Sequence, residues 1–105
     1  MRLINIVFAG VASIFASAAI VQAEDLPDQF RKEKCTMCHA VDHKSIGPSY
    51  LDIAAKYKGD AGALAKLTKK IKEGGGGVWG AAKMTPHPNI SQADLETMVK
   101  WILAH

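Results

Sequence analysis

The sequence predicts an all-α domain of four short helices, preceded by a segment that is not part of the fold. Three observations support this class. No stretch alternates apolar and polar residues in the way that a half-buried strand does. Four segments instead space their apolar residues three and four apart, as helices with one buried face do. The 105 residues suffice for one domain only, and the segments 35–47 and 74–90 connect the helices without a helical pattern.

The first two helices are predicted over residues 27–34 and from near Pro48 to Gly59. In the first, Leu26 and Phe30 lie four residues apart and share one face. A buried stripe of four residues marks the second: Tyr50, Ile53, Ala54 and Tyr57.

The third helix is predicted to follow Asp60 as its cap and to stop at Gly74, and the fourth to begin at Ser91. The stripe of the third helix consists of Leu64, Leu67, Thr68 and Ile71. The stripe of the fourth consists of Leu95, Met98, Val99 and Ile102, with Trp101 adding bulk beside it. Both stripes predict helices that bury one face against the rest of the domain.

Residues 1–23 have the features of a cleaved secretory signal peptide. Arg2 gives a positive start, residues 3–20 are almost wholly apolar, and Val21-Gln22-Ala23 places small residues where a signal peptidase reads them. The apolar run is also long enough for a retained membrane anchor, but its cleavage-like end favours removal. We therefore expect residues 24–105 to form the exported domain, in an oxidising compartment and without stable membrane insertion.

Charge and size restrict what this domain does. The chain has 13 Lys and Arg against 10 Asp and Glu, a formal charge of +3 that is too small and too evenly spread for nucleic-acid binding. A domain of this size has a marginally stable core and usually needs an additional stabilising feature, such as a disulfide or a bound group. Only two residues separate the two cysteines, so a disulfide between them would stabilise the domain little. We expect something else to fill the core.

Cys35-Thr36-Met37-Cys38-His39 is the strongest chemical signal in the chain. Cys-x-x-Cys-His is the attachment motif of c-type haem. Two thiols about one helical turn apart add to the two vinyl groups of one porphyrin, and His39 then projects its imidazole at the iron as the proximal ligand. The alternatives use fewer of these residues. A zinc site needs four ligands, a thioredoxin-like dithiol needs a βαβ setting, and a structural disulfide leaves His39 unexplained.

Met84 is the predicted sixth ligand. It lies in a proline-containing loop far from His39 in sequence, so it can reach the opposite haem face, and its segment has no helix face to fill. Met37 lies inside the attachment loop, and Met98 belongs to the stripe of the last helix. His87, three residues after Met84, is the alternative, and bis-histidine ligation would lower the reduction potential. A strong ligand at this position favours electron transfer, because it leaves no open site for oxygen or a substrate.

An ordered series of motifs runs through nearly all of residues 24–105: Phe30, Cys35-x-x-Cys38-His39, Ile46-Gly47-Pro48-Ser49-Tyr50, Asp52-Ile53-Ala54-Ala55-Lys56-Tyr57, Ile71-Lys72-Glu73-Gly74, Gly77-Val78-Trp79-Gly80, Met84 and Lys100-Trp101-Ile102-Leu103. This series resembles the small monohaem class I cytochromes c of bacterial respiratory chains. The closest type is the short periplasmic kind that donates electrons to nitrite reductases and terminal oxidases. The resemblance implies the class I cytochrome c fold, in which four short helices wrap around one covalently attached haem c, and a monomer located in the periplasm.

The resemblance also implies roles for individual residues. The Pro48 carbonyl would accept a hydrogen bond from the free ring nitrogen of His39, which fixes the orientation of that ring. The indole N–H of Trp79 would reach a haem propionate. Phe30 and Trp101 would form a structural contact between the first and last helices.

The loop that holds Met84 departs from the family pattern. Many relatives have Pro-Met-Pro-Pro-Asn there, and that Asn bonds the methionine sulfur. Here the run is Lys83-Met84-Thr85-Pro86-His87-Pro88-Asn89, so His87 stands at the position of that Asn and Asn89 comes later. Either side chain is therefore a candidate for the sulfur contact.

These residues predict a single-electron carrier and not an enzyme, with redox partners of the nitrite reductase, terminal oxidase or cytochrome bc1 type. The alternatives are a haem sensor or small peroxidase with an open or displaceable sixth site, and a thiol–disulfide enzyme. Four lysines near the two haem loops either steer acidic partners or serve only as solubilising charges: Lys32, Lys34, Lys44 and Lys83. Four others are mostly typical of a solvated helix face: Lys66, Lys69, Lys70 and Lys72.

Overall fold

The computed structural model describes residues 26–105 and, before them, only Gly10, Val11 and Ser13. The described part is all-α, which confirms the predicted class. It contains α1 (Asp28–Lys32), the single 3-10 turn η2 (Cys35–Met37), α2 (Tyr50–Lys56), α3 (Ala63–Glu73) and α4 (Gln92–Leu103). No strand forms within these residues; Gly75 and Met84 pair in an isolated antiparallel bridge.

The predicted signal peptide, residues 1–23, lies outside the described residues apart from those three positions. Among the residues that are described, no helix is long and apolar enough to cross a membrane. Removal of residues 1–23 therefore stays a prediction from the sequence.

The first two helices form where the apolar spacing predicts them, with shorter ends. Helix α1 stops at Lys32 and not at Lys34, because Lys34 adopts a left-handed φ of 60°, which a helix cannot continue through. Helix α2 begins at Tyr50, where the Ser49 hydroxyl accepts a hydrogen bond from the Asp52 N–H at 3.0 Å. This bond satisfies one of the free N–H groups of the first turn.

The cap predicted for the third helix is wrong by two residues. The N-cap of α3 is Gly62, and the Asp60 carboxylate accepts a hydrogen bond from the Gly62 N–H at 2.8 Å, one residue ahead of the helix. Helix α4 begins as predicted, because the Ser91 hydroxyl accepts from the Asp94 N–H at 3.1 Å.

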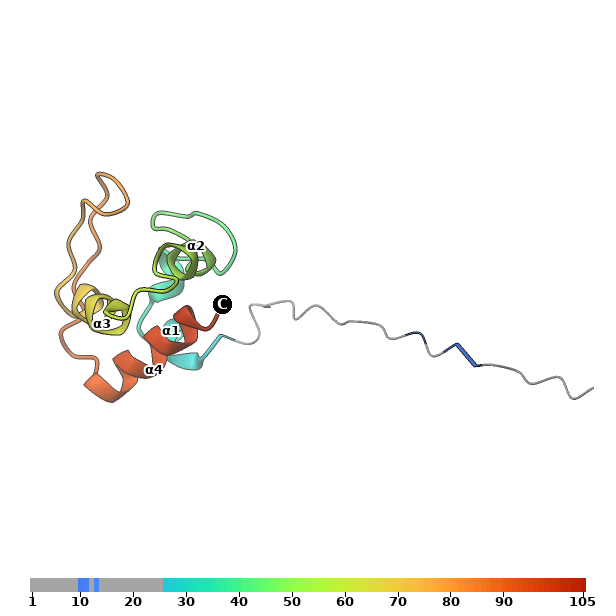
Figure 1. The fold of residues 1–105 in the computed structure, drawn as a ribbon. Helices are drawn as coiled ribbons and strands as arrows, with labels where there is room; N and C mark the ends of the chain where they lie inside the picture. Colours follow the sequence, from blue (N-terminus) through green and yellow to red (C-terminus); the bar gives the residue numbers. More distant parts are fainter. Residues whose placement is uncertain (1–9, 12, 14–25) are drawn as a thin grey trace, which may run out of the picture.

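Helix α4 organises the core, because it packs against α1, α2 and α3 (Figure 1). Its buried residues are the predicted stripe of Leu95, Met98, Val99 and Ile102. The rings of Phe30 and Trp101 lie 5.3 Å apart, which confirms the expected contact between the first and last helices. Two long connections, residues 38–49 and 74–91, leave this helical core and frame the site described next (Figure 1).

Candidate functional site

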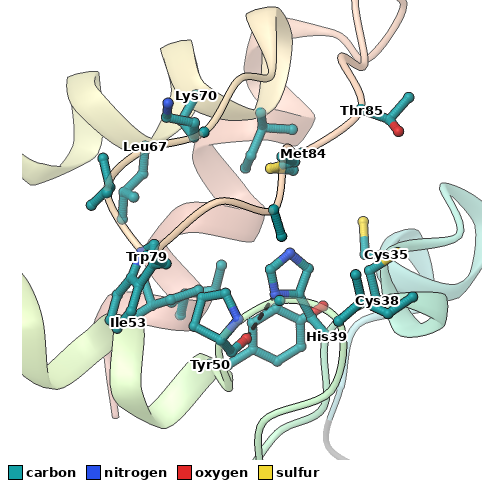
Figure 2. Close-up of a pocket in the computed structure, with 18 of the residues that line it drawn as sticks. Cys35, Cys38, His39, Tyr50, Ile53, Leu67, Lys70, Trp79, Met84 and Thr85 are labelled. Atoms are coloured by element: carbon teal, nitrogen blue, oxygen red, sulfur yellow. Dashed lines mark hydrogen bonds between the residues drawn. The ribbon is translucent and has the colours of Figure 1, made fainter.

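Residues from all four helices and both long connections line one largely apolar cleft. Cys35 and Cys38 lie at one end of the cleft, and Trp79, Leu67 and Lys70 lie towards the other (Figure 2). The site residues expected from the sequence, which lie between positions 35 and 84, therefore come together around a single space.

His39 is held on one side of the cleft by three contacts. Its Nδ1 lies 2.7 Å from the Pro48 carbonyl oxygen, so Nδ1–H donates to that oxygen and leaves Nε2 free. The ring stacks on Tyr50, with centroids 5.6 Å apart. The backbone of Gly47 also approaches the His39 ring, so closely that a Cβ added to Gly47 would lie 2.5 Å from His39 Cε1. Only glycine permits this approach.

The two thiols belong to the short turn η2. The N–H groups of Cys38 and His39 both donate to the Cys35 carbonyl oxygen, at 3.1 and 3.0 Å, and this winds the segment into one tight turn. Neither cysteine is in a disulfide. Burial raises the pKa of the Cys35 thiol, and the negative charge of Glu33 adds to the effect. A raised pKa disfavours the reactive thiolate that a thiol–disulfide enzyme needs.

Met84 is positioned through its backbone. Its N–H and carbonyl exchange hydrogen bonds with Gly75, at 2.8 and 3.0 Å. Gly74 has a φ of +69°, and a Cβ there would lie 2.5 Å from the Met84 carbonyl oxygen. The glycines that end α3 thus allow the returning chain to lie against them. Figure 2 shows the Met84 side chain on the opposite side of the cleft from His39.

Positive charge gathers near Trp79. The Lys56 ammonium lies 5.1 Å from the centroid of the Trp79 ring. The sequence predicts Lys70 on a solvated helix face, but in the structure Lys70 is half-buried and lines the cleft. The sequence could have indicated this position, because Lys70 lies three residues after the buried Leu67 and therefore at the border of the apolar helix face.

The histidines and methionines not chosen as ligands have distinct places. His87 lines the cleft and also borders a separate small hollow, whereas the exposed Asn89 borders only that hollow. The exposed His43 lies 2.9 Å from the Asp42 carboxylate. Met37 is 68% exposed, and Met98 is buried in the core at 1%. Of the two candidates for the sulfur contact, His87 is therefore the one that shares the cleft with Met84.

Comparison with known proteins gives consistent results. The family model for cytochrome c matches residues 27–105. The chain is 45% identical over 76 residues to cytochrome c-551 of Azotobacter vinelandii, which covers 72% of this chain and 92% of that protein. Wild-type Nitrosomonas europaea cytochrome c552 superposes with a TM-score of 0.70 at 44% identity, covering 73% of this chain and 95% of that one. The class 1 cytochrome MtoD of Sideroxydans lithotrophicus ES-1 gives a TM-score of 0.66 at 31% identity, covering 81% and 97%.

This chain therefore belongs to the cytochrome c family. Within that family it is a small monohaem class I protein, and its cofactor is one covalently attached c-type haem. Membership supports an electron-carrier role and does not favour the alternatives of a sensor, a peroxidase or a thiol–disulfide enzyme.

The residues of the cleft fit this haem. The two thiols suit its vinyl groups, the walls are apolar, and Lys70 and Trp79 offer charge and an N–H donor to its acidic edge. The Tyr50 hydroxyl, which is buried, has no hydrogen-bond partner among the described residues. Burial also raises the pKa of this hydroxyl far above its ordinary value, so it is a neutral donor. A polar atom of the cofactor would satisfy it.

Proposed function

We propose that the chain is an exported, periplasmic carrier of single electrons. Its haem would be attached through Cys35 and Cys38 and ligated on its two faces by His39 and Met84. The observation that supports this most directly is the placement of His39 and Met84 on opposite sides of one apolar cleft with both thiols at its end (Figure 2). When bound, the haem supplies the one-electron change at its iron.

The role of the proximal side is to hold one imidazole in one orientation. The Pro48 carbonyl selects the tautomer with a free Nε2 and raises the basicity of the ring. The stack on Tyr50 and the close Gly47 backbone oppose rotation of the His39 ring. A ligand held in this way rearranges little when an electron arrives or leaves.

The role of the other side is to close the site and raise the potential. A Met84 thioether as sixth ligand leaves no position for oxygen or a substrate. Thioether sulfur favours the reduced iron, and the apolar walls disfavour the extra charge of the oxidised form. Both effects act in the same direction, so we expect a positive reduction potential.

We propose that the carrier works as a monomer, catalyses no reaction itself and exchanges electrons with nitrite reductase, terminal oxidase or cytochrome bc1 type partners. The signal-like residues 1–23 support export to the periplasm. Lys34, Lys44 and Lys83 line the cleft, whereas Lys32 does not. This distribution supports steering of acidic partners by the first three lysines.

An absorption spectrum of the exported protein tests this function. The protein is made in a host with haem-attachment machinery, and the oxidised spectrum is extended into the far red. Sharp reduced bands with a weak far-red band from methionine on ferric iron are expected, and Met84→Ala should remove the far-red band. Haem bands without that feature in the unmodified protein would reject Met84 as ligand. Ready binding of carbon monoxide to the unmodified protein would favour a sensor or peroxidase instead.

A further inference from the structure

Besides His39 and Met84, two more side chains of the iron-ligating kind line the cleft: Met98, which is buried in the core, and His87. The proposed function does not use His87. Among the residues that line the cleft, the only imidazoles belong to His39 and His87. His39 has its Nδ1 committed to Pro48. His87 is half-buried, and no hydrogen bond of its ring is observed in the described part of the chain. Its imidazole is therefore a candidate ligand without a structural task of its own.

The backbone holds His87 in place independently of the Met84 side chain. The His87 N–H donates to the Ile71 carbonyl oxygen in the last turn of α3, at 2.9 Å. Met84 is held by its main-chain pair with Gly75. Only Thr85 and Pro86 separate the two anchored residues. Because all these bonds are between backbone atoms, loss of the Met84 thioether leaves His87 at the cleft.

Other groups of the chain are less suited to the same position. Four lysines also line the cleft: Lys34, Lys44, Lys70 and Lys83. A lysine ammonium must first lose its proton, which ordinarily requires a pH near 10. An imidazole instead offers a free nitrogen near neutral pH. The remaining described histidines do not line the cleft, since His43 is paired with Asp42 and the exposed His105 packs on Trp101.

We propose that His87 is a reserve ligand, which takes the sixth position when the Met84 thioether is lost. This inference rests on the proposed His39/Met84 ligation. Exchange of sulfur for a second imidazole would keep the site closed to small ligands and lower the reduction potential. The chain would then remain a closed electron carrier of lower potential and would not become an open, ligand-binding haem protein.

Four haem-loaded full-length proteins test the proposal: the unmodified chain, Met84→Ala, Met84→Ala with His87→Ala, and Met84→Ala with His43→Ala as the matched control. The readouts are the absorption spectrum of each protein and the carbon monoxide affinity of its reduced form. We expect Met84→Ala to stay low-spin and to bind carbon monoxide at least about tenfold more weakly than the double variant without His87. The reason is that apparent affinity falls with the fraction of molecules whose site is open. The His43 control should behave like Met84→Ala.

Equal carbon monoxide affinity in Met84→Ala and in its His87→Ala double variant would overturn the reserve-ligand proposal alone, provided that the unmodified protein shows its far-red methionine band. Absence of that band from the unmodified protein would instead reject the proposed function. Added imidazole should return the His87→Ala double variant to a low-spin spectrum, which shows that its cleft has folded. If imidazole fails to do so, the variant has lost the site, and His87→Asn in the Met84→Ala background then makes the same comparison. A low-spin Met84→Ala/His87→Asn protein would reject His87.

Discussion

The two sides of the cleft are built by different means. On the attachment side, residues 35–50, the ligand candidate His39 is held by its own side chain, through Pro48, Tyr50 and the close Gly47 backbone. The other side is formed by residues 74–90, here called the ribbon side. There Met84 is held through its main chain by Gly75, and Gly74 leaves space for the Met84 carbonyl oxygen. The attachment side thus fixes the orientation of the His39 ring, whereas the ribbon side fixes the backbone of Met84 but not its side chain. We infer that changes in residues 74–90 alter which ligand binds, and that changes in residues 35–50 alter either the attachment of haem or the orientation of His39.

Loss of the thiols should have the largest effect. Replacing both Cys35 and Cys38 by serine removes the two covalent links, so no haem should remain on the chain after denaturation. The domain should also lose its cooperative fold, because its core is marginal without the cofactor. Mass spectrometry of the denatured protein measures the attached haem. Retention of covalent haem in the double variant would contradict the attachment role of η2.

Gly74→Ala should disturb the ribbon side strongly. A Cβ at this position would lie 2.5 Å from the Met84 carbonyl oxygen and 2.8 Å from the Pro86 nitrogen, at a φ of +69°. We expect the free energy of unfolding to fall by about 1–3 kcal/mol beyond the control, with a weakened far-red band and full haem attachment. Gly59→Ala is the matched control, because its φ is +79° but nothing lies within 4 Å of the added atom. Equal losses in the two variants, measured by denaturant titration, would show that the contact with the Met84 backbone is unimportant.

Gly47→Ala is the corresponding change on the attachment side. The new Cβ would lie 2.5 Å from Cε1 and 2.9 Å from Nδ1 of His39, so the ring must shift, which disturbs its hydrogen bond to the Pro48 carbonyl. We expect a loss of about 1–2 kcal/mol in the free energy of unfolding. The reduction potential should shift while the far-red methionine band persists. An unchanged potential and stability would mean that His39 has more freedom than its three contacts indicate.

Reversal of charge should affect both sides alike if the lysines steer partners. Lys44→Glu lies on the attachment side and Lys83→Glu on the ribbon side, and both residues line the cleft. Each should slow electron transfer to an acidic partner several-fold at low salt, and the difference should shrink as salt screens the charges. Lys32→Glu, the same change away from the cleft, should matter less. A drop in rate without any change in its salt dependence would count against steering.

The smallest effect is expected from Asp60→Asn, a change just before α3 and away from both sides of the cleft. The Asp60 carboxylate lies 2.7 Å from the Lys66 ammonium and also accepts the Gly62 N–H. These contacts lower the pKa of Asp60 below its ordinary value, with Lys66 as the larger cause. Its contribution to stability is therefore present above the ordinary pKa and is lost as the pH falls through the lower, folded value. Thermal unfolding of Asp60→Asn as a function of pH should show less acid destabilisation than the unmodified chain. Parallel curves for the two proteins would contradict the assignment.

Much of the helical frame could be predicted, because apolar periodicity is a local property. The stripe of α4, the buried Leu26 and Phe30, and the Ser91 cap all lie where the spacing indicated. The C-terminal end of α1 and the start of α3 could not be predicted, since the left-handed Lys34 and the bond from Gly62 to Asp60 depend on where the chain must turn. The stop of α3 at Gly74 was predicted correctly. The prediction that Lys70 is solvated is wrong for a related reason. Residue spacing shows which helix face Lys70 lies on, but not that a loop distant in sequence covers that face.

By itself, the sequence determined the all-α class and the attachment chemistry, since the thiols and the imidazole of residues 35–39 are neighbours along the chain and one turn brings them together. Tertiary structure decided how the two ligand candidates from the distant segment, Met84 and His87, are held at the cleft. Met84 and His87 both line the cleft, and backbone hydrogen bonds tie their segment to Gly75 and to the last turn of α3. Such bonds join residues whose proximity no local pattern encodes, and for that reason the sequence left two candidate ligands where the structure assigns each a place.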